Sequence, residues 1–281
     1  MTPGPPASRS EASPVSQIAT NVLTALLEAR TGQQISAYRS WRLDTALKPL
    51  LRDRKLDTLD QLVTQLLEGS DRVIGDRIVD ALLNQETSFY RDALVFESLV
   101  EAIADAEAKG RAVRIWSAGC ATGQEPLSLA MLFSEAQERS GLPFPEIRAT
   151  DISARALARA RAGRYTQFEI QRGLSIRRMM EWFEVREEYW EAKAELRYRL
   201  LFARQNLMSD PMPSGKFDIV LCRNVLMYLS PAARSKVLDR IAGVLRPGGL
   251  LVLGAGETVI GHTEALVPSE RYRGLYRLAA H

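Results

Sequence analysis

Polar residues with a chemical use follow several apolar, strand-like runs of the sequence. The first run leads into a turn at residues 117–126, where Gly119 allows the backbone to approach a ligand closely. Glu125 follows in the first turn of an expected helix, where its charge opposes phosphate binding, although it could equally serve only to complement the helix dipole. The pattern G-x-G-x-x-G is absent because Ala121 and Gln124 stand where it needs glycine. The turn therefore favours a ligand without phosphate groups.

An acid follows the second strand-like run. Asp151 stands where a carboxylate can accept both hydroxyls of a ribose, or where it can cap a helix that starts at Ser153. An Asn-Leu pair at residues 206–207 and an Arg-Asn pair at 223–224 follow two later runs, and a Pro-Gly-Gly turn at 247–249 precedes the last run. A ribose acid, polar strand ends and no phosphate-binding turn together predict S-adenosylmethionine (SAM), which has an adenosine and an amino-acid tail but no phosphate.

Composition excludes several other chemistries. The chain has 281 residues with 46% hydrophobic side chains, and its formal charge of +3 lacks the basic excess typical of nucleic-acid-binding proteins. Its two cysteines, Cys120 and Cys222, and its two histidines have no metal-ligand spacing. The longest near-apolar run, residues 248–256, is too short to cross a bilayer, and no signal-peptide pattern is present. We expect a soluble cytoplasmic protein with buried thiols, no metal, no membrane insertion and no nucleic-acid partner.

Two kinds of patterning divide the chain into domains. Residues 1–15, rich in Pro, Ser, Gly and Ala, predict a disordered tail, and residues 16–85, with apolar side chains at helical spacing, predict a small all-helical domain of about four helices. Residues 86–110 are expected to form a linker and connecting helix. Residues 111–281 alternate short β-rich runs with amphipathic helices, which predicts an α/β domain with a doubly wound, mostly parallel sheet.

The α/β domain is expected to place its polar strand ends at one edge of the sheet. The expected strands are residues 112–117, 146–151, 198–204, 217–222 and 250–254, and the expected helices include residues 124–140, 153–162 and 231–245. Residues 273–278 are expected to add an antiparallel edge strand. A small subdomain is expected near residues 164–199, with a helix that reaches Phe183 and a hairpin that contains Trp190.

A basic stretch lies at residues 39–55 of the helical part. Its cations are Arg39, Arg42, Lys48, Arg52, Arg54 and Lys55, against Asp44 and Asp53. Helical spacing would gather several of these cations on one side. The stretch is either a solvated helix face or a docking surface for an acidic partner.

Several motifs, in order along the chain, resemble the CheR family of chemotaxis receptor (protein-glutamate) O-methyltransferases. The motifs are residues 86–92, 117–131, 149–153, 206–207 and 222–228, and the similarity spans residue 16 to the C-terminus. The resemblance implies a helical, receptor-docking domain followed by a Rossmann-like SAM-binding domain. It also implies methylation of glutamate side chains on the cytoplasmic helices of chemotaxis receptors for sensory adaptation, with S-adenosylhomocysteine as the other product.

The same resemblance implies the site residues. The cofactor would be held by Gln85, Thr87, Arg91, Gly119, Glu125, Asp151, Asn206, Leu207, Arg223 and Asn224, and Arg91 and Tyr228 would lie beside the methyl group. Three positions depart from the family pattern: Gln85 replaces an Asn but follows Asn84, Tyr90 replaces a Phe, and Gln124 replaces an acid. The subdomain resembles the version that works without a receptor pentapeptide tether.

The expected reaction needs no general base, because a glutamate carboxylate is already ionised near neutral pH. Alignment of the two reactants then supplies most of the catalysis. We expect Arg91 to hold a carboxylate by charge-assisted hydrogen bonds and Tyr228 to position the reacting atoms from the opposite side. Two alternatives stay open: methyl transfer to RNA or a small molecule, suggested by arginines between residues 155 and 178, and a non-catalytic, SAM-responsive docking module.

Overall fold

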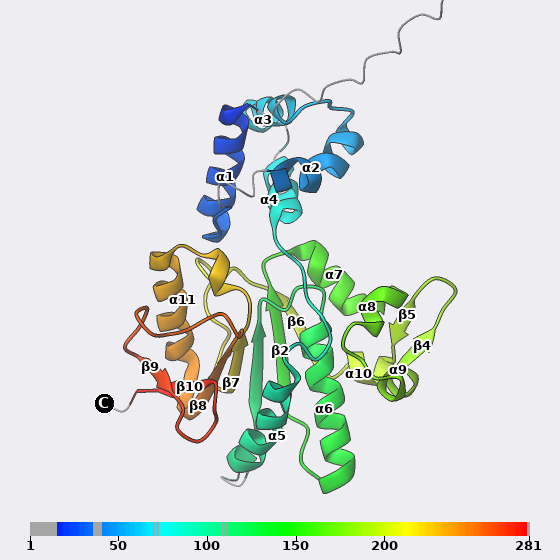
Figure 1. Ribbon diagram of the computed structural model, residues 1–281, viewed down its shortest axis with the longest axis vertical. Coiled ribbons are helices and arrows are strands. Elements are labelled where there is room, and N and C mark those ends of the chain that lie inside the picture. The colour runs from blue at the N-terminus through cyan, green and yellow to red at the C-terminus, as the bar shows by residue number, and fades with distance from the viewer. Residues whose placement is uncertain are drawn as a thin grey trace, which may run out of the picture. The chain divides into compact units, whose positions relative to one another are not determined.

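The computed structural model describes residues 16–35, 41–69, 71, 73–107, 110 and 112–279 (Figure 1). This part of the chain folds into two compact units, with boundaries after residues 30, 34 and 82. The short segment Thr31–Gln34 therefore belongs to the same unit as the chain from Leu83 onward. The expected tail at residues 1–15 and Arg39 of the basic stretch lie outside the described residues. No helix in the described ranges has the length and apolar character needed to span a membrane.

The first unit is built from helices. They are α1 (Gln17–Thr31), α2 (Trp41–Arg54), α3 (Leu59–Glu68) and α4 (Ile74–Leu82). Leucines at helical spacing, such as Leu43 and Leu47, are fully buried and form its core. The start of α3 is fixed by a capping box in which the Thr58 side chain accepts from the backbone of Gln61 and the Gln61 side chain accepts from the backbone of Thr58.

The second unit is organised around a seven-stranded sheet of order β6-β2-β1-β7-β8-β10-β9. Its strands are β1 (Arg114–Ala118), β2 (Glu146–Asp151), β6 (Leu200–Arg204), β7 (Phe217–Cys222), β8 (Leu245–Leu253), β9 (Leu266–Pro268) and β10 (Leu275–Leu278). The strands from β6 to β8 are parallel, whereas β10 is antiparallel to β8 and to β9. The prediction of an antiparallel strand near the C-terminus is confirmed, but its place at the edge is wrong. The three-residue β9 lies outside it and is too short to give a periodic pattern.

Helices cover both faces of this sheet, as a doubly wound fold requires. They are α5 (Ala93–Glu107), α6 (Gln124–Ser140), α7 (Ala154–Ala162) and α11 (Pro231–Val244). On β7, Ile219 and Leu221 belong to the core shared with α5 and α6, while Val220 and Cys222 belong to the core shared with α11. In Figure 1, α11 flanks the β7–β8–β10 part of the sheet, and α6 and α7 flank β2 and β6. Burial on both faces explains why β7 is one continuous apolar run.

The predicted boundary between the last large helix and the last parallel strand is wrong. The helix ends at Val244, and β8 begins at once with Leu245, which pairs with Phe217 across a register irregularity. The predicted Pro-Gly-Gly turn lies inside this irregular first half of β8. A Cβ on Gly249 would lie 2.9 Å from the Arg246 carbonyl oxygen, so only glycine fits where these backbones meet.

A small three-stranded sheet of order β3-β5-β4 occupies the expected subdomain region. Its elements are β3 (Arg164–Tyr165), α8 (Gln167–Gln171), α9 (Ile176–Trp182), β4 (Phe183–Val185), β5 (Trp190–Ala192) and α10 (Ala194–Arg197). The expected hairpin around Trp190 is the β4–β5 pair, but Phe183 starts a strand instead of ending a helix. Phe89 packs edge-to-face on Tyr165 and Phe183, with ring centroids 5.0 and 5.6 Å away. The small sheet therefore anchors the segment before Arg91.

Candidate functional site

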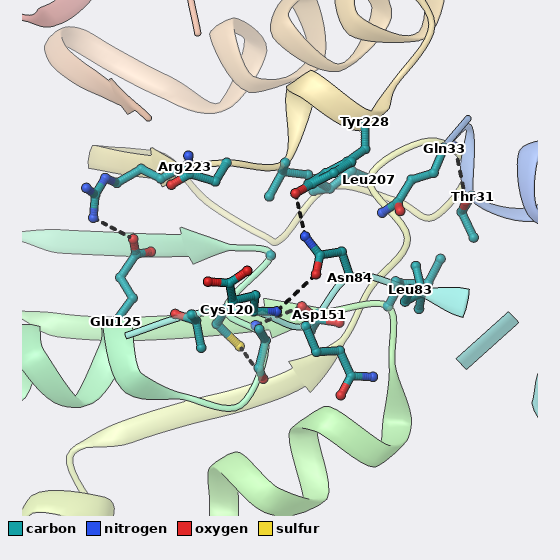
Figure 2. Close-up of a pocket in the computed structure, with 18 of the residues that line it drawn as sticks. Thr31, Gln33, Leu83, Asn84, Cys120, Glu125, Asp151, Leu207, Arg223 and Tyr228 are labelled. Carbon is teal, nitrogen blue, oxygen red and sulfur yellow. Dashed lines mark hydrogen bonds and ion pairs between the residues drawn. The ribbon is translucent and has the colours of Figure 1, made fainter. Parts of the chain in front are cut away.

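A cavity opens beyond the carboxyl ends of β1, β2, β6 and β7 (Figure 2). Every residue predicted to bind the cofactor or to lie at the methyl group lines it: Gln85, Thr87, Arg91, Gly119, Glu125, Asp151, Asn206, Leu207, Arg223, Asn224 and Tyr228. Segments far apart in the sequence thus meet at one place.

The backbone N–H groups of the turn after β1 donate hydrogen bonds to other groups of the protein. The N–H groups of Gly119 and Cys120 donate to the Thr150 carbonyl oxygen at 2.8 and 3.0 Å, and the Ala121 N–H donates to Asp151 Oδ2 at 2.8 Å. A phosphate cradle needs such groups free for the ligand. These hydrogen bonds agree with the expectation of a ligand that carries no phosphate.

Gly119 itself is required by crowding. Its φ is 79°, a left-handed conformation, and a Cβ there would lie 2.5 Å from Val225 Cγ2. Any other side chain would push apart the turn after β1 and the loop after β7. Both of these segments line the cavity.

Asp151 is held in place by the backbone at the end of β2. Its Oδ2 accepts from Ala121 N and its Oδ1 accepts from Ser153 N, each at 2.8 Å. Ser153, not Asp151, is the N-cap of α7, because its side chain accepts from the Ala156 N–H. The capping alternative for Asp151 is therefore wrong, and its carboxylate faces the cavity from a fixed position.

Arg223 forms a polar network beneath the cavity, with a side chain only 2% exposed. One of its terminal nitrogens lies 3.2 Å from Glu125 Oε2, and the other lies 2.6 Å from Asp92 Oδ2 and 2.7 Å from the Arg91 carbonyl oxygen. Ser117 Oγ donates to the second Glu125 oxygen at 2.7 Å. Figure 2 shows the Arg223–Glu125 pair, which links the segment after β7 to the first turn of α6. The Arg223 side chain thus braces the site from within the protein.

The turn that carries Arg91 is strained. Tyr90 and Asp92, on either side of it, have φ values of 45° and 56°, which non-glycine residues rarely adopt. The Tyr90 N–H donates to Ser128 Oγ at 3.0 Å, and the Arg223 contacts hold Asp92. The Arg91 guanidinium, by contrast, has no hydrogen bond or ion pair with any described residue. A rigid turn therefore presents an uncommitted cation to the cavity.

The Tyr90 hydroxyl, which the sequence introduces in place of a Phe, has no hydrogen-bond partner among the described residues. Burial is the largest cause that raises the pKa of this phenol, and the Arg178 guanidinium, 4.1 Å from the ring centre, opposes it. The departure from the family pattern is thus accommodated by a cation–π contact and not by a hydrogen bond.

Tyr228 is positioned from two directions. Asn84 Nδ2 donates to its hydroxyl (Figure 2), and the Gln34 N–H donates to its carbonyl oxygen at 2.7 Å. Gln85 Nε2 donates to Ser153 Oγ at 3.1 Å, so Asn84, not Gln85, supplies the amide that reaches Tyr228. Asn84 was missing from the predicted site residues, although the shifted asparagine beside Gln85 was the signal that pointed to it.

The Asn-Leu pair after β6 is positioned by hydrogen bonds within its own turn. Asn206 Oδ1 accepts from Met208 N at 2.9 Å, and Asp210 Oδ2 accepts from Asn206 N at 2.8 Å. Arg240 of α11 donates to the Met208 carbonyl oxygen at 2.7 Å. Leu207 is thereby presented to the cavity as an apolar wall.

The amide of Asn224 provides a test of whether a ligand fits. Its Oδ1 is buried and accepts no hydrogen bond within the described chain, which costs about 1–3 kcal/mol unless a ligand supplies a donor. Together with the fixed Asp151 carboxylate and the free Arg91 guanidinium, this donor and acceptor set suits a molecule with hydroxyl, amino and carboxylate groups and no phosphate. SAM is such a molecule, and the residues present fit it.

The cysteines supply no nucleophile. Both are free and buried, and burial is the largest cause that raises the pKa of each thiol well above its usual range. Asp151 and Glu125 add to the effect at Cys120. The described residues also contain no group of three or more His, Cys, Asp or Glu that could hold a metal ion.

Comparisons with known proteins agree with this geometry. The family "CheR methyltransferase, SAM binding domain" matches residues 85–273. A chemotaxis protein methyltransferase of Vibrio parahaemolyticus is 38% identical over 242 residues, which cover 85% of this chain and 88% of that protein. One from Vibrio anguillarum is 39% identical with the same coverage, and chemotaxis protein methyltransferase 1 of Pseudomonas aeruginosa is 35% identical over 83% of this chain and 87% of its own length.

Proposed function

The chain belongs to the CheR methyltransferase family, a family of SAM-dependent enzymes, and on this premise we propose that it converts glutamate side chains of chemotaxis receptors to methyl esters. The acceptor glutamates would lie on the cytoplasmic helices of the receptors, which places the enzyme in the cytoplasm. The observation that carries the proposal is the meeting of Arg91, Tyr228 and the polar strand ends around one cavity.

Different residues of the cavity would bind different chemical groups of SAM. Asp151, fixed by two backbone donors, would hold the ribose hydroxyls, and the Asn224 amide oxygen would accept from an amino group. Glu125 would contribute negative charge near the cofactor's cationic tail, with Arg223 keeping the carboxylate in place. When bound, SAM supplies the activated methyl group.

Arg91 and Tyr228 would serve the acceptor. The uncommitted Arg91 guanidinium can orient a carboxylate through charge-assisted hydrogen bonds, which are roughly twice as strong as neutral ones. The Tyr228 hydroxyl, held by Asn84, can contact the second oxygen of the same group. Neither residue has to remove a proton, because a glutamate is ionised at neutral pH.

We propose that the helical unit docks the receptor through three exposed cations. Lys48, Arg52 and Lys55 follow one another at helical spacing and form no ion pair with described residues. Arg54, in contrast, pairs with Asp71 and so is withdrawn from the predicted basic face. The solvated-face alternative predicts that these cations do not matter for catalysis.

The docking proposal is tested with the double variant Lys48→Gln/Arg52→Gln. We expect the KM for a receptor fragment to rise about 10-fold and to lose much of its salt dependence, while SAM affinity stays unchanged. The control is Arg77→Gln, which removes an exposed cation from α4 of the same unit. A double variant with the wild-type KM at low salt would exclude this face.

The function is tested by transfer of labelled methyl groups from SAM to cytoplasmic receptor fragments from the same cell. Label that base releases as methanol identifies glutamyl esters. Base-stable label, or label on RNA, would overturn the proposed acceptor. The RNA alternative loses support because five of the seven arginines between residues 155 and 178 are in ion pairs: Arg159, Arg164, Arg172, Arg177 and Arg178, with Glu169, Glu191, Glu86, Glu181 and Glu135 respectively.

A further inference from the structure

Glu257 lies in the connection after β8 and does not line the cavity, yet its carboxylate contacts the segment that does. Its Oε2 accepts from the Asn224 N–H at 2.7 Å and from the Gly254 N–H at 2.9 Å. Its Oε1 accepts from the Met227 N–H at 3.0 Å. One side chain thus satisfies three backbone donors from two different strand ends.

These three donors need such a partner because the backbone after β7 leaves the sheet at once. Asn224 has a φ of 58°, a left-handed conformation in which the chain leaves the extended course of β7. The Glu257 carboxylate replaces the missing ladder partner and stabilises this conformation. Without it, the N–H groups of half-buried Asn224 and buried Gly254 would lose their acceptor.

Close packing shows that the arrangement is built around Asn224. A Cβ on Gly254 would lie 2.7 Å from Asn224 Nδ2 and 3.0 Å from its backbone nitrogen, so the end of β8 must be glycine for Asn224 to sit where it does. Glu257 is linked to the same glycine by two hydrogen bonds, since its own N–H donates to the Gly254 carbonyl oxygen at 2.9 Å. The carboxylate therefore connects the end of β8 to the Asn224 turn.

The hydrogen bond from the Met227 N–H to Glu257 also restrains the backbone next to Tyr228, the residue proposed to contact the acceptor. Met227 precedes Tyr228 in a short 3-10 helix, Leu226–Tyr228, so fixing the Met227 N–H restricts the backbone that carries the Tyr228 ring. Tyr228 also accepts from Asn84 and from the Gln34 N–H, and its own N–H donates to the Val225 carbonyl oxygen at 3.2 Å, but none of these is a side-chain contact to the Asn224 N–H. Within the described contacts, Glu257 is thus the side chain that bridges the two halves of this loop.

We propose that Glu257 is a positioning residue of the methyl-transfer site, one whose carboxylate fixes Asn224 for the cofactor and the Met227–Tyr228 backbone for the acceptor. The inference rests on the proposed function in that it takes Asn224 and Tyr228 to act on these two ligands. Glu257 itself contacts neither of them.

The two carboxylate oxygens make a graded test possible. In Glu257→Gln the amide oxygen can keep the Asn224 and Gly254 donors, but the amide nitrogen then faces the Met227 N–H and cannot accept from it. We expect kcat to fall about 10-fold while the SAM dissociation constant changes less than about threefold. In Glu257→Ala all three contacts are lost, and we expect kcat to fall about 100-fold and SAM binding to weaken about 10-fold.

The control is Glu264→Gln, which removes an exposed carboxylate from the same connection between β8 and β9. It should leave kcat and SAM binding within twofold of the wild type. SAM binding is measured by calorimetry and kcat by receptor methylation, at a temperature where circular dichroism shows each variant folded. A merely structural role predicts lower thermal stability with kcat and SAM affinity unchanged in the folded protein, and that result would overturn the proposal.

Two further outcomes are decisive. If Glu257→Ala does not fold, Glu257→Gln alone provides the test. A larger loss of kcat than of SAM affinity in that variant supports the proposal, and equal losses of both contradict it. If the wild type methylates no receptor, the proposed acceptor fails, while SAM calorimetry on Glu257→Ala and Glu264→Gln still supports or overturns the role of Glu257 toward Asn224.

Discussion

The carboxyl edge of the large sheet and the small three-stranded sheet differ in how many residues have a strained backbone conformation. Of the non-glycine residues with positive φ in the described chain, Tyr90, Asp92, Ala121 and Asn224 lie in segments of the cavity, and none lies in the small sheet. In the region of the small sheet, α8 begins with a regular capping box formed by Thr166 and Glu169. Strain of this kind persists only where surrounding contacts enforce it, and here it is concentrated where ligands bind.

Charges differ between the two regions in the same way. The Arg223 side chain is 2% exposed and forms ion pairs with Glu125 and Asp92, whereas the side chains of Arg186 and Glu184 at the small sheet are each 51% exposed. Breaking a buried pair leaves a charge without compensation, but an exposed pair contributes about 0–1 kcal/mol. The comparison predicts that changes at the cavity alter catalysis strongly and that changes in the small sheet alter stability slightly.

The largest effect is expected for Arg91→Ala. Loss of the one uncommitted guanidinium on the described cavity wall should lower kcat about 100- to 1,000-fold, as the loss of a preorganised donor does in other enzymes. The measurement is steady-state methylation of a receptor fragment. Arg155→Ala, an exposed arginine of α7, serves as the control. Equal activity of the two variants would remove Arg91 from the site.

A smaller effect is expected for Asp92→Asn. The substitution weakens the ion pair with Arg223, which holds the strained turn around Arg91, and kcat should fall about 10-fold, the equivalent of about 1.4 kcal/mol in the barrier. Glu97→Gln removes a similar exposed charge from α5 and should change nothing. If both variants behave alike, the turn does not depend on Arg223.

The smallest effect is expected for Glu191→Gln in the small sheet. Glu191 lies 3.3 to 3.8 Å from Arg164, Arg186 and Arg197, but two of these partners are more than half exposed, so the pairs are discounted for solvent screening. A total near 1 kcal/mol would lower the melting temperature by about 2–4 °C. SAM affinity should not change, and a marked loss of it would show that the small sheet is coupled to the cavity.

Local pattern accounts for the parts of the structure that were predicted well. The strands at residues 146–151 and 217–222 have the predicted bounds. The first strand has apolar Ile147 and Ala149 at alternate positions and ends in an acid, and the second is mostly apolar and is followed by Arg223. The site residues came from motifs whose members lie close together in sequence, and the fold brings them to one cavity.

The remaining features depend on contacts between distant segments. Nothing around Glu257 in the sequence indicates that it will accept from Asn224 and Met227, some thirty residues earlier, because backbone donors carry no sequence signature. The basic face was overestimated for a similar reason, since the partner of Arg54 is Asp71 on a different part of the helical unit. The residues predicted from motifs line the cavity, whereas a residue that binds another residue's backbone, such as Glu257, was not predicted.

The unit that carries the cavity is built from two separate stretches of the sequence, because it includes the four-residue segment Thr31–Gln34. This segment belongs to the same unit as the chain from Leu83 onward, where Gln33 bridges Leu229 and Gln34 donates to the Tyr228 carbonyl oxygen. A gene fragment that begins at Leu83 would therefore encode a methyltransferase lacking part of the backbone that supports its tyrosine. Recombination that exchanges the helical unit for another module must keep or replace this segment, so the two units are constrained to evolve together although each has its own core.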